Sequence, residues 1–159
     1  MKKSIYLVLF AISLMAACTQ VEKKQVVVTE MDSTMTPECC AVKDGVFIHI
    51  SNAGNDPHRA VMPLKMATMM AMDKPVLVYF DIKGIELVLK DAKDVTYPTF
   101  PSAKESLKKL VDMKVTLMAC PSCMEAAGKT VDDLIPGVIM AEKEKFFNFT
   151  KGRIITLDY

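Results

Sequence analysis

Short, continuously apolar runs alternate with segments of helical periodicity from residue 44 to the C-terminus, and this alternation constrains the fold more than any other feature. The pattern predicts strands at residues 46–50, 75–80, 115–119 and 153–157. It predicts helices at residues 57–72, 85–89, 102–113, 121–127 and 141–149. Strands that alternate with helices form βαβ units, and parallel strands buried on both faces are apolar throughout. We therefore predict one α/β domain over residues 44–159, a three-layer sandwich around a mostly parallel sheet.

Pro63 leaves the course of the predicted helix at residues 57–72 open. A proline inside a helix removes a backbone hydrogen bond and costs about 3 kcal/mol. Either the helix bends at Pro63, or residues 56–62 form an irregular turn and the helix begins after them.

Residues 1–17 have the layout of a secretory signal peptide. Lys2 and Lys3 precede an apolar run at residues 5–14, and small residues then lead to Cys18. This layout also resembles the lipobox of bacterial lipoproteins, in which the cysteine is lipidated and becomes the mature N-terminus. An ordinary cleaved signal peptide or a membrane anchor is the alternative, although the apolar run is short for a transmembrane span.

A lipidated Cys18 predicts a protein held on a membrane surface in the cell envelope. Gln20 stands where an Asp is associated with inner-membrane retention in some Gram-negative bacteria, which favours the outer membrane, facing the periplasm. Residues 18–43 are mostly polar and have the composition of a flexible tether. The predicted organisation is thus a signal peptide (1–17), a lipidated cysteine with its tether (18–43) and the α/β domain (44–159).

The composition excludes several classes of function. The formal net charge of +1 argues against binding to nucleic acid. The sequence contains no phosphate-binding loop, dinucleotide fingerprint or hydrolase triad, so we expect neither a kinase nor a conventional hydrolase and predict no cofactor. The methionine-rich residues 66–72 are expected in the core rather than at a copper ion, because methionine fills irregular gaps.

The segment Cys120-Pro-Ser-Cys123 directly follows the predicted strand at residues 115–119. Pro121 suits the first turn of a helix, whose N-terminus stabilises a negative charge. Such a setting lowers the pKa of a thiol and increases the fraction of reactive thiolate. We therefore predict Cys120 as the functional thiol and Cys123 as its partner, in a spacing that resembles the redox motif of thioredoxin-like proteins.

Polar residues that follow the first two predicted strands are expected near Cys120. The carboxyl ends of parallel strands meet at one edge of a sheet, where α/β proteins bind their ligands. Asn55, Asp56 and Asp81 are the candidate binding residues at that edge. Asp56 has the alternative role of helix N-cap, and Asp81 that of capping the turn that follows it.

The first turn of the predicted helix at residues 57–72 adds His58 and Arg59 to the candidate binding residues. Arg59 can hold a small anion or favour the thiolate electrostatically. The alternative is that both side chains are merely solvated. His49 lies in mid-strand between apolar residues, where we expect a buried structural histidine rather than a ligand.

Four cysteines remain after Cys18, two in the predicted tether and two in the predicted site. Two such pairs can form a structural disulfide in an oxidising compartment or hold zinc in a tetrahedral site. Cys39 and Cys40 are adjacent, whereas zinc ligands are usually separated by about two to four residues, so no metal is predicted. A disulfide from Cys39 or Cys40 to Cys120 is the alternative to a reactive thiol.

Several short motifs together resemble the DsrE/DsrF-like proteins of the DsrEFH superfamily over about residues 44–159. They are Asn55-Asp-Pro-His-Arg-Ala60, Val78-Tyr-Phe-Asp81 with Gly84, Pro98-Thr-Phe-Pro-Ser102, Cys120-Pro-Ser-Cys-Met-Glu-Ala-Ala-Gly128 and Asp133-Leu-Ile-Pro-Gly-Val138. Their order and spacing carry the resemblance.

The resemblance implies a flavodoxin-like fold with a five-stranded sheet and assembly into trimers or hexamers. Some members of the family carry sulfane sulfur as a persulfide on one cysteine at a strand end, eight residues before a glycine. Here that cysteine is Cys120, with Gly128 after it, and Cys123 matches a second cysteine found in some members.

The sequence thus predicts an envelope-anchored thiol protein that binds or relays sulfane sulfur on Cys120, with Cys123 as the resolving thiol. Its expected partners are small sulfur species or a sulfur-donor or sulfur-acceptor protein, the membrane through the lipid anchor, and further copies of the chain. The alternatives are a non-catalytic, oligomeric module that binds a small ligand and has structural cysteines, and a metal protein with cysteine ligands.

Overall fold

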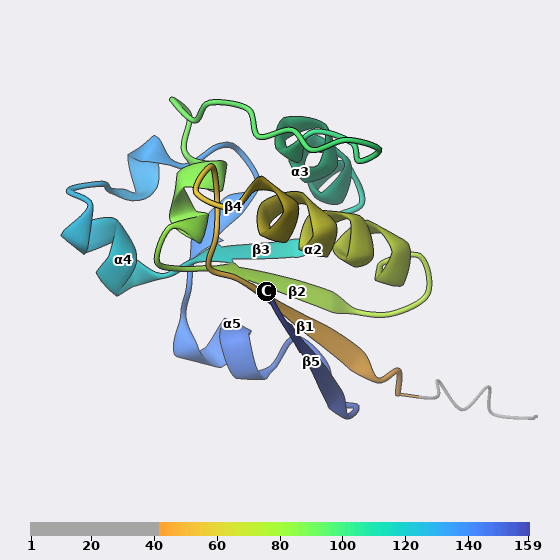
Figure 1. Ribbon diagram of the computed structural model, residues 1–159. Helices are drawn as coiled ribbons and strands as arrows, with labels where there is room; N and C mark the ends of the chain where they lie inside the picture. Colours follow the sequence, from red (N-terminus) through yellow and green to blue (C-terminus); the bar gives the residue numbers. More distant parts are fainter. Residues whose placement is uncertain (1–41) are drawn as a thin grey trace, which may run out of the picture. The chain divides into compact units, whose positions relative to one another are not determined.

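The computed structural model describes residues 42–159, which form a parallel sheet with helices on both faces (Figure 1). The strands are β1 (Gly45–Ile50), β2 (Val76–Phe80), β3 (Thr116–Ala119), β4 (Val138–Met140) and β5 (Ile154–Asp158). The helices are α2 (Pro57–Met70), α3 (Ala103–Asp112), α4 (Pro121–Ala126) and α5 (Lys143–Phe147), with the 3₁₀ helices η1 (Gly84–Val88) and η2 (Val131–Asp133). The predicted signal peptide, Cys18, Cys39, Cys40 and the tether as far as residue 41 lie outside the described residues.

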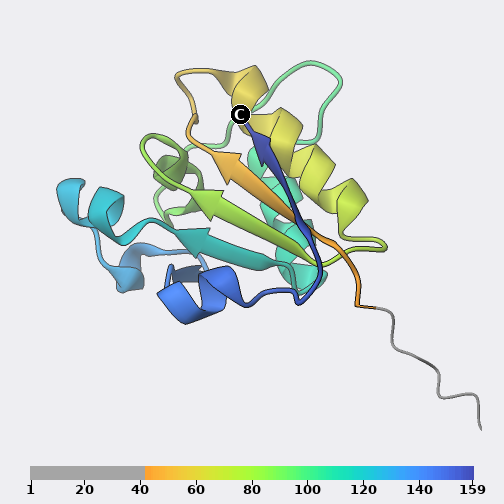
Figure 2. The ribbon, with the colours of Figure 1, turned by 90° about the horizontal axis from the view of Figure 1, so that it is seen from below.

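The five strands are ordered β4-β3-β2-β1-β5, and every neighbouring pair is parallel. Crossover connections between parallel strands are right-handed, and they place α2 and α3 on one face of the sheet (Figures 1 and 2). The connection from β4 to β5 crosses the sheet in the opposite direction, so α5 lies on the other face. Alternate residues of β1, Ile48 among them, are fully buried and join Leu64 of α2 and Leu107 of α3 in the main core. Within residues 42–159 no helix is long and apolar enough to cross a membrane.

The predicted α/β class, with three layers around a five-stranded parallel sheet, is confirmed. The sequence pattern located four strands and missed β4, which is only 3 residues long and follows the turn at Gly137. The strand order differs from the 2-1-3-4-5 order of flavodoxin, because the first three crossovers all run in the same direction. Helix α5 is shorter than the helix expected at residues 141–149, since only Lys143–Phe147 is helical.

Helix α2 runs through Pro63 without interruption, so the irregular turn that the sequence left open does not form. Asp56 is the N-cap, and its Oδ1 accepts the backbone N–H of Arg59 at 3.2 Å. Pro57 occupies the first turn, where its missing N–H has no helical partner to lose. Pro63 is buried, and this burial offsets part of the cost of its lost hydrogen bond.

The carboxyl ends of β1, β2 and β3 lie side by side, as parallel pairing requires. The backbone N–H of Asp81 donates to the carbonyl of Ile50 at 3.2 Å, and that of Cys120 donates to the carbonyl of Phe80 at 2.8 Å. A Cβ on Gly84 would lie 2.0 Å from the Ile50 carbonyl oxygen, so only glycine lets the turn after β2 pack on the end of β1. The side chains that follow these strands are therefore neighbours.

Candidate functional site

Two free thiols lie where β3 passes into α4. Cys120 is the N-cap of α4, and Cys123 is in the first turn of that helix. Both side chains are half-buried, and the two thiols are close enough that each shifts the pKa of the other. This proximity makes the pair able to form a disulfide.

The turn after β2 supplies a donor to the second thiol. The backbone N–H of Ile82 donates to Cys123 Sγ at 3.1 Å. Ile82 has a φ of 46°, a left-handed conformation that is strained for a β-branched residue and costs about 1–3 kcal/mol. Strain of this size is found at functional sites, where the surrounding structure holds the residue in place.

Tyr79 of β2 is the neighbour that most favours the Cys120 thiolate. Burial alone would raise the pKa of Cys120, but the Tyr79 hydroxyl, the backbone N–H groups of Cys123 and Ser122, and the Cys123 thiol together lower that pKa below the usual value of a thiol. Burial, followed by the same contact with Cys120, raises the pKa of Tyr79, so the phenol stays protonated and donates. Because α4 has only 6 residues, we assign the effect to these donors rather than to a helix dipole.

The second thiol is perturbed in the opposite direction. Burial and the neighbouring Cys120 sulfur raise the pKa of Cys123, and the Ile82 N–H only partly opposes them. Cys120 is therefore the thiol that ionises first, and Cys123 stays protonated beside it. In such a pair, Cys120 is suited to act as the nucleophile and Cys123 to react in a second step.

A histidine between two carboxylates lies next to the thiols. His49 Nε2 is 2.8 Å from Asp81 Oδ1, and His49 Nδ1 is 2.5 Å from Asp158 Oδ1. The contact with Asp81 is an ion pair rather than a hydrogen bond, since neither His49 Nε2 nor Asp81 Oδ1 has a hydrogen-bond partner. Burial alone would lower the pKa of His49, but the two carboxylates outweigh it and raise that pKa. The ring of His49 also lies 6.0 Å from that of Tyr79, which places this cluster beside the Cys120 donor.

Of the predicted binding residues, Asp81 is the one whose contacts connect it to the thiols, since its charge raises the pKa of Cys123. Asn55 is engaged within its own loop, where its Oδ1 accepts the Ala53 N–H at 2.8 Å. His58 stacks on Tyr97 with ring centroids 4.3 Å apart.

Asp56 and Arg59 contact each other at the start of α2. Asp56 caps α2, and its Oδ2 is 3.6 Å from Arg59 Nε. Arg59 also lines a hollow with Ser51, Asp158 and Tyr159. The structure therefore places this arginine at the β5 side of the edge.

Sequence reasoning missed four residues of the site, namely His49, Tyr79, Ile82 and Asp158. His49 and Tyr79 are polar residues in otherwise apolar strands, paired in register across β1 and β2. Because side chains alternate between the two faces of a strand, the sequence could have indicated that His49 and Tyr79 lie on the same face of the sheet. The positive φ of Ile82 and the approach of β5 to β1 have no such signal in the sequence.

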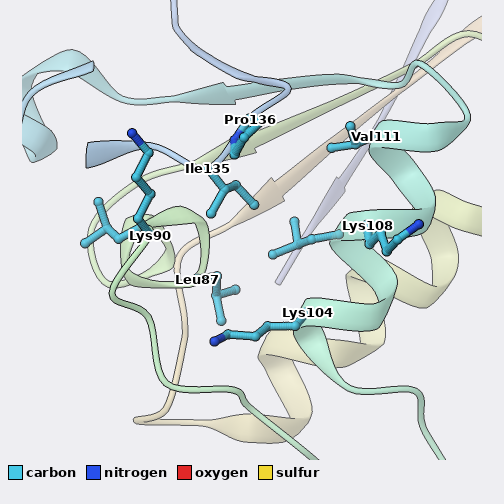
Figure 3. Close-up of a pocket in the computed structure, with 9 residues that line it drawn as sticks. Leu87, Lys90, Lys104, Lys108, Val111, Ile135 and Pro136 are labelled. Atoms are coloured by element: carbon cyan, nitrogen blue, oxygen red, sulfur yellow. The ribbon is translucent and has the colours of Figure 1, made fainter. Parts of the chain in front are cut away.

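Two further hollows border the segment that follows β2. The first, of about 570 Å³, has Cys123 in its wall together with Ile82, Ile85, Leu89, Ala126 and Ala127. The second, of about 400 Å³, is formed by η1, α3 and the segment before β4, and the sticks of Leu87, Val111, Ile135 and Pro136 show its apolar lining (Figure 3). Of these two hollows, the first is lined by a cysteine of the thiol pair, and the second is not.

No cluster of three or more histidine, cysteine, aspartate or glutamate side chains within residues 42–159 is arranged to hold a metal ion. The metal hypothesis also used Cys39 and Cys40, which lie outside the described residues.

Comparison with known proteins places this chain in a family. No curated protein matches the chain. The crystal structure of the ychN protein from E. coli is similar, with a TM-score of 0.57 and 15% identity over 73% of this chain and 99% of that one. A protein of unknown function from Methanobacterium thermoautotrophicum, MTH1491, has a TM-score of 0.52 and 17% identity over 72% of this chain and 99% of its own. At these identities the likeness shows the fold. The model of the DsrE/DsrF-like family matches residues 44–154, well over half of the sequence, and the chain therefore belongs to the DsrE/DsrF-like family.

Proposed function

We propose that this protein accepts sulfane sulfur as a persulfide on Cys120 and releases it as hydrosulfide through Cys123. The observation that carries the proposal is the opposite perturbation of two adjacent thiols, with the pKa of Cys120 lowered and that of Cys123 raised. Donors converge on Cys120, where a persulfide anion would need the same stabilisation as a thiolate. Family membership supports the same chemistry.

Loading begins with the Cys120 thiolate as nucleophile. It attacks the terminal sulfane sulfur of a polysulfide or organic persulfide, a new S–S bond forms on Cys120, and the donor leaves shortened by one sulfur atom. The number of negative charges does not change, and no outside oxidant is needed. The Tyr79 hydroxyl and the Ser122 and Cys123 N–H groups stabilise the anion.

Release uses the second thiol. Cys123 attacks the Cys120 sulfur, the sulfane sulfur departs as hydrosulfide carrying the proton from Cys123, and a Cys120–Cys123 disulfide remains. The two thiols are oxidised by two electrons, and the sulfane sulfur is reduced by two. The Ile82 N–H at 3.1 Å holds the Cys123 sulfur beside its target.

The setting that we propose for this chemistry is the cell envelope, with Cys18 lipidated and the domain tethered to the membrane. The N-terminal layout of Lys2, Lys3, the apolar run and small residues before Cys18 supports this location. Small sulfur species or a sulfur-donor or sulfur-acceptor protein are the partners that the thiol pair suits, and we propose a homo-oligomer on the family resemblance.

Intact mass spectrometry of the full chain before and after polysulfide treatment tests the proposal, with alkylation to map each cysteine. We expect a gain of one sulfur atom on Cys120 that reductant removes. Cys120→Ser should not load, and Cys123→Ser should hold the persulfide longer because it cannot release it. Equal loading of Cys120→Ser, or a disulfide from Cys39 or Cys40 to Cys120 that blocks loading, would contradict the proposal and favour a binding module with structural cysteines.

A further inference from the structure

The hollow beside Cys123 has a composition that the thiol pair alone does not explain. Its volume of about 570 Å³ is within the range of sites for small molecules. Of the two thiols, Cys123 lines it and Cys120 does not. A molecule bound there would therefore meet the Cys123 sulfur first.

The walls of this hollow are largely apolar and its charges are paired. Ile82, Ile85 and Leu89 line it beside the alanines of α4. Lys83 Nζ lies 3.2 Å from Glu86 Oε1, and Lys129 Nζ lies 3.0 Å from Asp91 Oδ2. Because each lysine is already neutralised, the hollow offers no unpaired cation to an anionic ligand and favours an uncharged, apolar one.

The Cys123 sulfur must be reduced again after each cycle of the proposed reaction. In the proposed function, release of hydrosulfide leaves a Cys120–Cys123 disulfide, which two thiols must reduce before another cycle. An attacking thiol expels the sulfur that is the better leaving group, and a thiol of lower pKa leaves faster. Tyr79 and the backbone donors favour departure of the Cys120 thiolate, so attack on Cys123 is the productive direction.

We propose that the hollow beside Cys123 binds an uncharged, apolar, low-molecular-weight thiol that reduces the disulfide by attacking the Cys123 sulfur. This inference rests on the proposed function, because that function creates the disulfide. In the first step the bound thiol loses its proton to solvent, its sulfur bonds to Cys123, the Cys120–Cys123 bond breaks, and Cys120 departs as a thiolate. In the second, another thiolate attacks the entering sulfur, a small disulfide leaves, and Cys123 regains its thiol by taking a proton from solvent.

The test uses the full chain with its Cys120–Cys123 disulfide formed by diamide, so that it does not depend on polysulfide loading. Butanethiol, cysteamine and 2-mercaptoethanesulfonate are compared as uncharged, cationic and anionic reductants. Each reduction rate is divided by the rate of the same thiol with a small disulfide. We expect butanethiol to be favoured about tenfold, as burial of about two methylene groups implies.

A variant of the wall and a matched control locate the effect. Ala126→Gln places a polar side chain in the wall of the hollow and should abolish the preference for butanethiol. Glu125→Gln introduces the same residue one position earlier on α4, outside the lining, and should keep the preference. Acid quenching and peptide mass spectrometry should find the butylthio group on Cys123.

The outcomes separate the two proposals. Equal normalised rates for the three thiols, a butylthio group on Cys120, or failure of diamide to join Cys120 to Cys123 would overturn the inference. If the preference for butanethiol is found but polysulfide does not load Cys120, the inference holds for this disulfide and the sulfur-carrier proposal fails. If loading occurs without the preference, only the inference fails.

Discussion

The imidazole of His49 on β1 contacts the carboxylate of Asp158 on β5, with Nδ1 2.5 Å from Oδ1. The two residues are 109 positions apart in the sequence, and parallel pairing of β1 with β5 places them opposite each other. On its other side the same ring faces Asp81, which follows β2. One histidine thus connects three strands at the edge of the sheet that carries the thiols.

Replacing His49 should lower stability in a pH-dependent way. The carboxylates of Asp81 and Asp158 raise the pKa of His49 against the effect of burial. The stabilisation is therefore complete below the unfolded pKa of about 6.5 and fades as the pH rises through the higher folded pKa. We expect His49→Gln to cost about 1 kcal/mol near pH 6 and less near pH 9, measured by urea unfolding.

The second histidine of the chain provides the control for this experiment. His58 stacks on Tyr97 and contacts Phe100, so replacing it removes aromatic packing rather than an ion pair. The cost of His58→Gln should change less between the two pH values. A cost of His49→Gln that grows toward high pH would show that the imidazole is not stabilised in its charged form.

Removing the Tyr79 hydroxyl should make Cys120 less reactive. The hydroxyl is the largest of the contributions that lower the pKa of this thiol. A hydrogen bond to a charged group is worth about 1.5–3 kcal/mol, so Tyr79→Phe should slow alkylation of Cys120 by iodoacetamide about tenfold near pH 7. The pH profile of alkylation should move to higher pH. The control is Tyr97→Phe, which alters a tyrosine stacked on His58 and should leave the alkylation rate unchanged. An unchanged rate in Tyr79→Phe would show that Tyr79 does not activate Cys120.

Adding one methyl group at Gly84 should disturb both the fold and the second thiol. An alanine Cβ would lie 2.0 Å from the Ile50 carbonyl oxygen, so the turn that carries Ile82 must move. Overpacking of this kind costs about 1–3 kcal/mol, measurable by urea unfolding. Alkylation of Cys123 should become slower, because the Ile82 N–H that lowers the pKa of this thiol shifts away. Gly54→Ala has open space around its Cβ and should stay within about 0.5 kcal/mol of the wild-type protein. A wild-type stability for Gly84→Ala would mean that the turn adapts freely.

The sequence was informative where the physical cause is local. The apolar runs indicated four of the strands, and the helix predicted at residues 102–113 forms as α3, which begins with a capping box of Ser102 and Glu105. Strand alternation and proline placement act over a few residues, so they can be recognised without tertiary structure. Strand β4 was not predicted, because a strand of 3 residues is too short to show a hydrophobic period.

For the site, the sequence predicted the thiol pair, because Cys120 follows a strand and Cys123 lies in the next helical turn. It also indicated Asp81 at the same edge. The residues around the pair could be identified from the folded structure alone. They are Tyr79, the donor to Cys120, and His49, which lies between Asp81 and Asp158. These contacts join separate strands whose neighbours depend on the order β4-β3-β2-β1-β5. Burial of the core against helices on both faces sets that order, and no local pattern specifies it.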